Sequence, residues 1–118
     1  MKKKGILKFH DLYKDFISID QLSRIFDLIL QKKYFGTYNV SLGQKVYMSE
    51  ILDWLNCRNR NKDNIIWLKN DKKFEKKHSF TLNNKKIYKK IKYMPKKTDL
   101  KKFCIKLSNI IHKKNKTN

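Results

Sequence analysis

The chain of 118 residues contains no alanine, one proline, three glycines and two cysteines. Its glycines stand apart from one another, so it has neither a G-x-G-x-x-G nor a G-x-x-x-x-G-K-[ST] loop with which to cradle phosphates. Cys57 and Cys104 are far apart, and no histidine stands at ligand spacing from either. This excludes a disulfide framework and a cysteine–histidine zinc motif. We therefore expect the chain alone to bind no metal and no cofactor.

Long apolar segments are missing as well. No run approaches the ~20 residues of a membrane-spanning helix, and Met1-Lys2-Lys3-Lys4 lacks the apolar stretch of a secretory signal. We expect a cytoplasmic protein with reduced thiols and no membrane partner. The length allows one domain, which we place at residues 1–112, followed by a basic disordered tail at residues 113–118.

What is abundant is positive charge. Thirty Lys and Arg residues against ten Asp and Glu residues give a formal net charge of +20. Only three of the basic residues are arginines, the side chain that recognises phosphate in a bidentate way. Together with the absence of alanine, the excess of lysine indicates a strong compositional bias toward AT-rich codons. We therefore interpret most of the charge as compositional, although residues 69–118 carry +15 of it.

Apolar periodicity predicts an α+β fold, a small mixed domain of short strands and three to four helices. The predicted helices are residues 20–31, residues 49–57, a short helix after Asn83 or Asn84 with Ile87, Tyr88 and Ile91 inside, and a last helix from Thr98. The predicted strands are residues 6–9, 15–19, 37–40, 46–48, 64–68 and 79–82, with loops at residues 57–64 and 69–78. Ser18 or Asp20, Ser49 and Thr98 are expected to cap helices. The apolar face of the first helix contains Leu22, Ile25, Phe26, Ile29 and Leu30, and Cys104 is expected in the core.

Four segments resemble, in the same order, motifs from the C-terminal half of the extended short-chain dehydrogenases/reductases. Tyr13-Lys14-Asp15-Phe16-Ile17-Ser18-Ile19-Asp20 is similar to R-D-F-[IV]-x-[VI]-x-D, and residues 36–43 are similar to G-x-[YF]-N-[VIL]-G-[ST]-G, with Ser41 in place of a glycine. Residues 46–51 resemble the family segment that leads into its next helix. The fourth segment, Ser79-Phe80-Thr81-Leu82-Asn83-Asn84-Lys85-Lys86, resembles S-x-x-L-D-N-x-K. These enzymes are NAD(P)-dependent epimerases, dehydratases and reductases of nucleotide sugars. The last motif is closest to the dTDP-4-dehydrorhamnose reductase type.

The resemblance implies a nucleotide-sugar-binding portion that is not catalytic alone. The family's glycine-rich Rossmann half would lie outside this sequence, which then reads as a fragment, a truncated gene or one chain of a split enzyme. NAD(P) is implied only for a complete enzyme. A Tyr-x-x-x-Lys pair, the catalytic signature of the family, occurs at Tyr88 and Tyr93, but chance explains both matches in so lysine-rich a chain.

By the same resemblance, Lys14 stands where the family has an arginine near the nucleotide diphosphate, and Lys76 or Lys77 stands near a second one. Phe16 and Ile17 are expected in the core, Asp20 at a helix cap, and Asn39 bonded to backbone groups. The implied partners are a nucleotide-sugar diphosphate and a separate Rossmann-domain chain. Without that chain, exposed apolar surface would cause marginal folding or self-association.

Two alternatives remain. The first is a small basic nucleic-acid-binding protein, whose bases would stack on aromatic residues that lie among lysines. The candidate stacking residues are Phe74, Phe80, Tyr88 and Tyr93. Within the leading hypothesis, nucleic acid would bind only non-specifically, through charge. The second alternative is an inactive remnant of a truncated gene.

Overall fold

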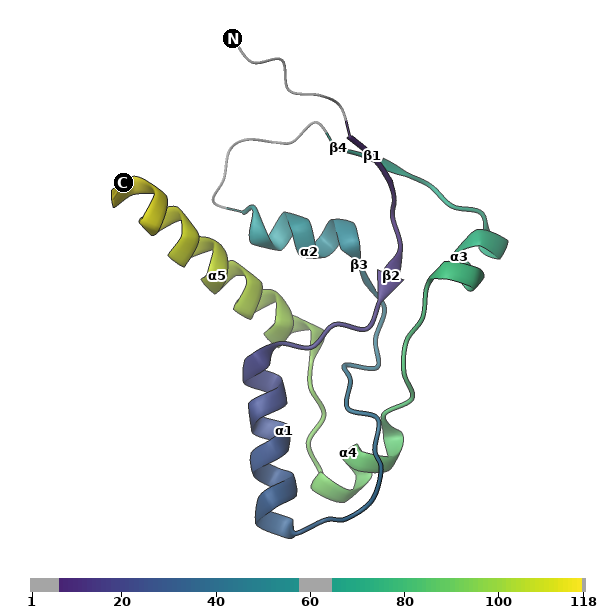
Figure 1. Ribbon diagram of the computed structural model, residues 1–118, viewed down its shortest axis with the longest axis vertical. Coiled ribbons are helices and arrows are strands. Elements are labelled where there is room, and N and C mark those ends of the chain that lie inside the picture. Colours follow the sequence, from purple (N-terminus) through teal and green to yellow (C-terminus); the bar gives the residue numbers. More distant parts are fainter. Residues whose placement is uncertain (1–6, 58–64, 118) are drawn as a thin grey trace.

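The computed structural model describes residues 7–57 and 65–117 (Figure 1). In chain order, the elements are β1 (Leu7–His10), β2 (Tyr13–Lys14), α1 (Ile19–Lys32), β3 (Val46–Tyr47), α2 (Met48–Leu55), β4 (Ile65–Leu68), α3 (Lys72–His78), α4 (Lys85–Ile91) and α5 (Lys97–Thr117). The predicted α+β class is confirmed. The described part of the chain has five helices, one more than the upper end of the expected three to four.

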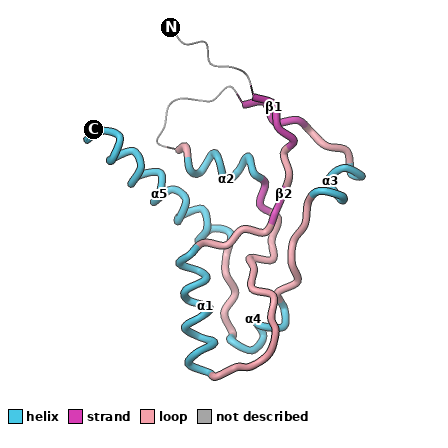
Figure 2. Tube along the Cα trace, viewed as in Figure 1, coloured by secondary structure: helices cyan, strands magenta, loops and turns pink. Residues whose placement is uncertain are grey.

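The strands form two separate pairs. β1 and β4 are parallel, with Leu7 opposite Ile65 and His10 opposite Leu68. β2 and β3 are antiparallel, with Tyr13 opposite Tyr47. Figure 2 shows that these pairs follow one another from top to centre, with α2 and α5 on one side of them, α3 on the other side, and α1 and α4 at the lower end. Residues 11–12 join β1 directly to β2, so the two pairs are neighbours.

The molecule is a thin slab. It measures 58 × 44 × 18 Å, and its radius of gyration is 17.6 Å, against about 13.5 Å for a compact domain of this length. Two small buried clusters form the core. The first joins α1 to α4, and the second joins the β3 region to α5. The members of the first cluster are Ile25, Ile87, Tyr88 and Ile91, and those of the second are Leu42, Val46, Leu100 and Cys104.

Phe16 and Ile17 pack against these two clusters, as predicted: Phe16 against the second and Ile17 against the first. Cys104 is also buried, as expected. Because Phe16 and Ile17 are adjacent in an extended segment, their side chains point in opposite directions and can reach different clusters. The segment between β2 and α1 therefore links the two halves of the core.

The helix caps follow the sequence in part. Ser18 caps α1: its hydroxyl accepts from the N–H of Gln21, and the Gln21 side chain accepts from the N–H of Ser18. Asp20 lies in the first turn instead, where its charge suits the helix dipole. The predictions of Ser49 and Thr98 as caps were wrong, because α2 begins at Met48 and α5 begins at Lys97, which places both residues inside their helices.

Several predicted strands are not strands. Residues 37–40 and 79–82 are loops, and the extended pairing expected at residues 15–19 occurs at Tyr13–Lys14 instead. The strand β4 was predicted, but it is only half-buried. Residues 69–78, predicted as a loop, contain α3, whose start is capped by the Asp71 carboxylate accepting from Phe74 N–H. Of the loop predicted at residues 57–64, only Cys57 falls within the described residues.

The two long helices expose part of their apolar faces. On α1, Phe26 is 52% exposed and Leu30 is 74% exposed, although the periodicity placed both with buried Ile25. On α5, Ile110 and Ile111 are exposed beyond buried Leu100. The helix also continues through residues 113–117, for which the sequence predicted a disordered tail. Among the described residues, no helix combines the length and the apolar character needed to cross a membrane.

Candidate functional site

The four family-like segments meet around the carboxylate of Asp15, at the end of β2. Asp15 accepts hydrogen bonds from the N–H groups of Leu42 (2.8 Å) and Gly43 (3.1 Å), which belong to the second segment. It also accepts from the N–H of Leu82 (3.0 Å), in the fourth segment. The third segment joins through β3, the partner strand of β2. Asp15 therefore fastens loops that lie 27 and 67 positions away from it in the sequence.

Further hydrogen bonds strengthen this junction. Tyr13 N–H donates to the hydroxyl of Ser79, and the side chain of Asn84 donates to the carbonyl of Ser41. The hydroxyl of Tyr88 donates to the same carbonyl and accepts from Ser41 N–H. Burial raises the pKa of Tyr88 to about 12, so this hydroxyl is protonated at neutral pH.

Gly43 takes a φ of +72°, a conformation that a glycine adopts without strain, as the sequence suggested. A Cβ at this position would lie 2.3 Å from the side-chain nitrogen of Asn84. Glycine is therefore required both by the backbone conformation and by the closeness of the fourth segment. The neighbouring Ser41 is buried, and among the described residues its hydroxyl has no hydrogen-bond partner.

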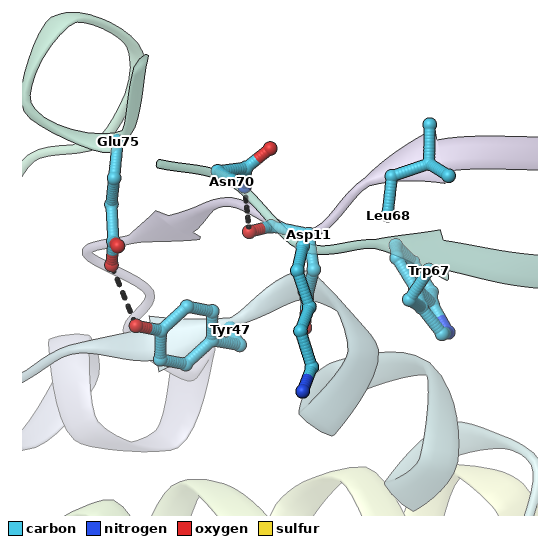
Figure 3. A pocket seen from close by; sticks show the side chains of 7 residues that line it. Asp11, Tyr47, Trp67, Leu68, Asn70 and Glu75 are labelled. Atoms are coloured by element: carbon cyan, nitrogen blue, oxygen red, sulfur yellow. Dashed lines mark hydrogen bonds between the residues drawn. The ribbon is translucent and has the colours of Figure 1, made fainter. Parts of the chain in front are cut away.

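Beside this junction lies a crevice of about 350 Å³, between the β1–β4 pair, β3 and α3 (Figure 3). Tyr47 and Glu75 form one wall, and Trp67 and Leu68 of β4 form the opposite one. The remaining lining residues are Asp11, Lys69 and Asn70. The crevice thus combines an aromatic surface, two carboxylates, an amide and the ammonium of Lys69.

Most polar groups of the crevice are held in place by neighbours. The Asp11 carboxylate accepts from the N–H (3.1 Å) and the hydroxyl (2.6 Å) of Ser49, at the start of α2. The amide of Asn70 donates to the carbonyl of Asp11. The Tyr47 hydroxyl donates to Glu75 across 2.6 Å, and this bond, with a smaller contribution from burial, raises the pKa of Tyr47 to about 12. Tyr47 is therefore a neutral hydrogen-bond donor at physiological pH and not a base.

Aromatic rings connect the crevice to α3. The His10 ring lies 4.4 Å from the ring of Phe74, which lies 4.3 Å from that of His78. A hydrogen bond of 2.6 Å joins His10 to Asn70. This stack fixes α3 over β1 and keeps Glu75 opposite Tyr47.

The structure brings Lys14 to the end of α3. Its ammonium donates to the carbonyl of His78 and lies 4.9 Å from the centre of the Phe80 ring. Lys76 and Lys77 are exposed in the last turn of the same helix. The three lysines predicted from the resemblance thus belong to one region, although Lys14 already has an intramolecular partner. Asn39 donates to the carbonyl of Asn83, which links the second and fourth segments as a backbone contact of the expected kind.

Sequence reasoning overlooked the crevice residues. Asp15 was visible as the fixed acidic position of the first motif, but Trp67 and Glu75 lie in segments without any motif. No group of three or more His, Cys, Asp or Glu side chains in the described part of the chain could hold a metal ion. A scan against protein-family models and searches of curated proteins and of solved structures each found no match for this chain.

Proposed function

We propose that the chain is the nucleotide-sugar-binding portion of an NAD(P)-dependent epimerase, dehydratase or reductase of the extended short-chain dehydrogenase type. The observation that carries the proposal is the junction at Asp15. Four segments chosen only for their resemblance to family motifs are bonded to one another there, through Leu42, Gly43 and Leu82 and through the pairing of β2 with β3. Contact among these segments is what a shared substrate-covering domain requires.

The crevice suits the sugar part of such a ligand. Trp67 offers an apolar ring surface, and Asn70, Tyr47 and Glu75 offer groups that can exchange hydrogen bonds with sugar hydroxyls. Among the charged lining residues, the carboxylates of Asp11 and Glu75 outnumber the ammonium of Lys69 and disfavour a diphosphate. We therefore place the diphosphate outside the crevice, at the lysines around the end of α3: Lys14, Lys76 and Lys77.

We place no dinucleotide site on the described residues. The N–H groups most like an anion-binding turn, those of Leu42 and Gly43, already donate to Asp15. Hydride transfer therefore requires NAD(P) to be held elsewhere, and in the proposed enzyme a separate Rossmann-domain chain supplies that site. Such a partner would also cover apolar surface that this thin molecule exposes on α1.

The test is a titration of the purified chain with dTDP-glucose at low ionic strength, followed by calorimetry and by the NMR signal of the Trp67 indole. We expect weak, saturable binding that perturbs Trp67. Lys14→Met should weaken it about fivefold, because an exposed charge contact contributes on the order of 1 kcal/mol. The matched control is Lys101→Met, which removes an exposed lysine from α5 and should leave the affinity unchanged.

Two results would contradict the proposal. One is the absence of saturable binding, or binding that leaves the Trp67 signal unmoved. The other is rapid NAD(P)H oxidation by the chain alone with a 4-keto sugar nucleotide, because that activity requires a dinucleotide site, which the proposal places on another chain.

A further inference from the structure

An exposed aromatic side chain in a lysine-rich part of the surface lies at the opposite end of the molecule from the β1–β4 pair. Phe35, in the loop that follows α1, is 87% exposed. This loop lies beside α4 at the lower end of Figure 1, and the Tyr34 hydroxyl donates to the carbonyl of Lys90 on α4. We call the group formed by Tyr34, Phe35, Tyr38, Lys86 and Lys90 the Phe35 patch.

The lysines of the Phe35 patch are held in position. The Lys90 ammonium donates to the Tyr38 hydroxyl (2.9 Å) and lies 5.6 Å from the centre of the Tyr34 ring. The Lys86 ammonium donates to the carbonyl of Thr37 (3.3 Å) and lies 5.1 Å from the centre of the Tyr38 ring. Because these contacts restrict both side chains, an anion that binds here orders them at a smaller entropic cost than it would free surface lysines.

The backbone beneath Phe35 is fixed as well. The Tyr38 hydroxyl donates to the carbonyl of Phe35 (2.7 Å), and Tyr34 and Tyr38 pack against the buried cluster of α1 and α4. The ring of Phe35 is therefore presented to solvent by a loop that is anchored on both sides. An aromatic ring displayed in this way contributes almost nothing to the core, whereas exposed aromatic rings of this kind are a common means of binding bases.

Carboxylates are absent from the two segments that form this surface. Residues 28–40 and residues 76–98 contain no Asp or Glu. They do contain several exposed lysines close to the patch in sequence. These are Lys32, Lys33, Lys85, Lys86, Lys89 and Lys90. Within these two segments the positive charge is therefore not offset by acidic residues, whereas Asp20 and Asp27 accompany Arg24 earlier in α1.

We propose that the Phe35 patch binds single-stranded nucleic acid, with the Phe35 ring stacked on an unpaired base and Lys86 and Lys90 contacting the adjoining phosphates. A duplex would satisfy the lysines but would offer no base face to Phe35, whereas a single strand satisfies both. An acidic polypeptide would supply charge without a planar heterocycle. This activity is independent of nucleotide-sugar binding, because it uses the other end of the molecule.

The residues differ from those that the sequence suggested for such a role. Tyr88 is buried and bonded to Ser41, so it cannot stack on a base. Phe74 lies between the rings of His10 and His78, and Phe80 lies under the ammonium of Lys14. Phe35 was not among the candidates, because its exposure follows from the loop geometry and not from any sequence pattern.

The experiment measures binding of short fluorescent oligouridylate and oligothymidylate by anisotropy over a range of salt concentrations. Phe35→Ser removes the ring without changing any charge, so it separates stacking from the general attraction of a +20 chain. Stacking on one base corresponds to about a tenfold loss of affinity. The control Ile111→Ser removes an exposed apolar side chain from the distant end of α5 and should have no effect.

A second pair of variants tests the lysines. The double variant in which glutamine replaces both Lys86 and Lys90 should bind more weakly. The slope of log K against log salt concentration should also fall by about 1.4, because each phosphate contact that is lost on a single strand accounts for roughly 0.7. The same double replacement at Lys101 and Lys106, which are exposed on α5, removes equal charge and should change the slope less.

Two outcomes would overturn the proposal. The first is an unchanged affinity of Phe35→Ser for both oligonucleotides. The second is an equal loss of affinity of that variant for heparin or for an acidic Glu-rich polypeptide, neither of which has bases. The latter result would assign the Phe35 patch to an acidic partner instead.

Discussion

Replacing Asp15 with alanine tests whether the junction of the four segments holds the fold together. The carboxylate accepts from three backbone N–H groups, those of Leu42, Gly43 and Leu82. Alanine offers no acceptor in place of the carboxylate. The variant therefore leaves three donors to solvent and releases two loops at once.

The magnitude follows from the burial of each bond. The bond to Leu42 is partly buried and involves a charged acceptor, so it contributes about 1.5 kcal/mol. The bonds to Gly43 and Leu82 are exposed, and each contributes about 0.7 kcal/mol, near the lower end for a hydrogen bond. Asp15→Ala should therefore lower the free energy of unfolding by about 3 kcal/mol. For a domain of this length the melting temperature should fall by roughly 12 °C.

Urea unfolding followed by circular dichroism measures the effect. A correction is needed because losing any carboxylate raises the net charge of a chain that already carries +20. Asp27→Ala, on the exposed side of α1, makes the same change of charge and supplies that correction. If Asp15→Ala is no less stable than Asp27→Ala, the junction does not contribute to stability and the reasoning from its hydrogen bonds fails.

Three further predictions concern buried hydroxyl groups, those of Ser41, Ser18 and Tyr88. Ser41→Ala should leave the stability unchanged or raise it by up to about 1 kcal/mol, because it removes a buried hydroxyl without a described partner. Ser18→Ala, which removes the cap of α1, should lower the free energy of unfolding by about 1 kcal/mol in the same urea assay. If Ser41→Ala lost as much stability as Ser18→Ala, this account of the two hydroxyls would be wrong. The folded state raises the pKa of Tyr88 from 10 to about 12, so the stability that its protonated hydroxyl contributes is complete below pH 10 and is lost as the pH rises toward 12. Between pH 10 and pH 12, the free energy of unfolding should depend less on pH in Tyr88→Phe than in the unmodified chain. If the dependence is the same in both, the Tyr88 hydroxyl is not the source of the lost stability.

The helices were the part of the fold that the sequence predicted well. Their apolar residues recur at helical spacing, and local signals such as Ser18 with Gln21 mark where a helix starts. The helix α3 was missed because its residues, Lys72–His78, contain only one apolar side chain, Phe74. Its stability comes from contacts distant in sequence, the ring of His10 and the hydroxyl of Tyr47, which no local pattern reveals.

Strands were predicted poorly for a related reason. Residues 37–40 and 79–82 carry the alternation of a strand, but their backbone groups bond to side chains instead of to a neighbouring strand. Leu82 N–H donates to Asp15, and the carbonyl of Thr37 accepts from Lys86. A sequence shows which residues favour extended backbone, but it does not show whether another strand is available to pair with them.

The candidate site also has a part that the sequence predicted, the lysines, and a part that it did not, the crevice. Lys14, Lys76 and Lys77 were selected by resemblance, and they do lie around one end of α3. The crevice beside them could not be predicted, because apart from Tyr47 its lining residues lie in segments without a motif. Trp67 reaches it only through the parallel pairing of β4 with β1, two strands that are far apart in the sequence.

The exposed face of α1 shows why periodicity overestimates a core. Apolar residues occupy more than half of the circumference of this helix. One part of this arc, with Ile25 and Leu28, packs on the core, and the other part carries Ile19, Phe26 and Leu30. In a slab only 18 Å thick, α4 and α5 cover the first part of that arc, and Ile19, Phe26 and Leu30 remain 52–74% exposed. A contiguous apolar face on a helix marks an interaction surface. Because this face carries few charges, an apolar partner surface fits it better than an anionic ligand does, as the proposed Rossmann-domain partner requires.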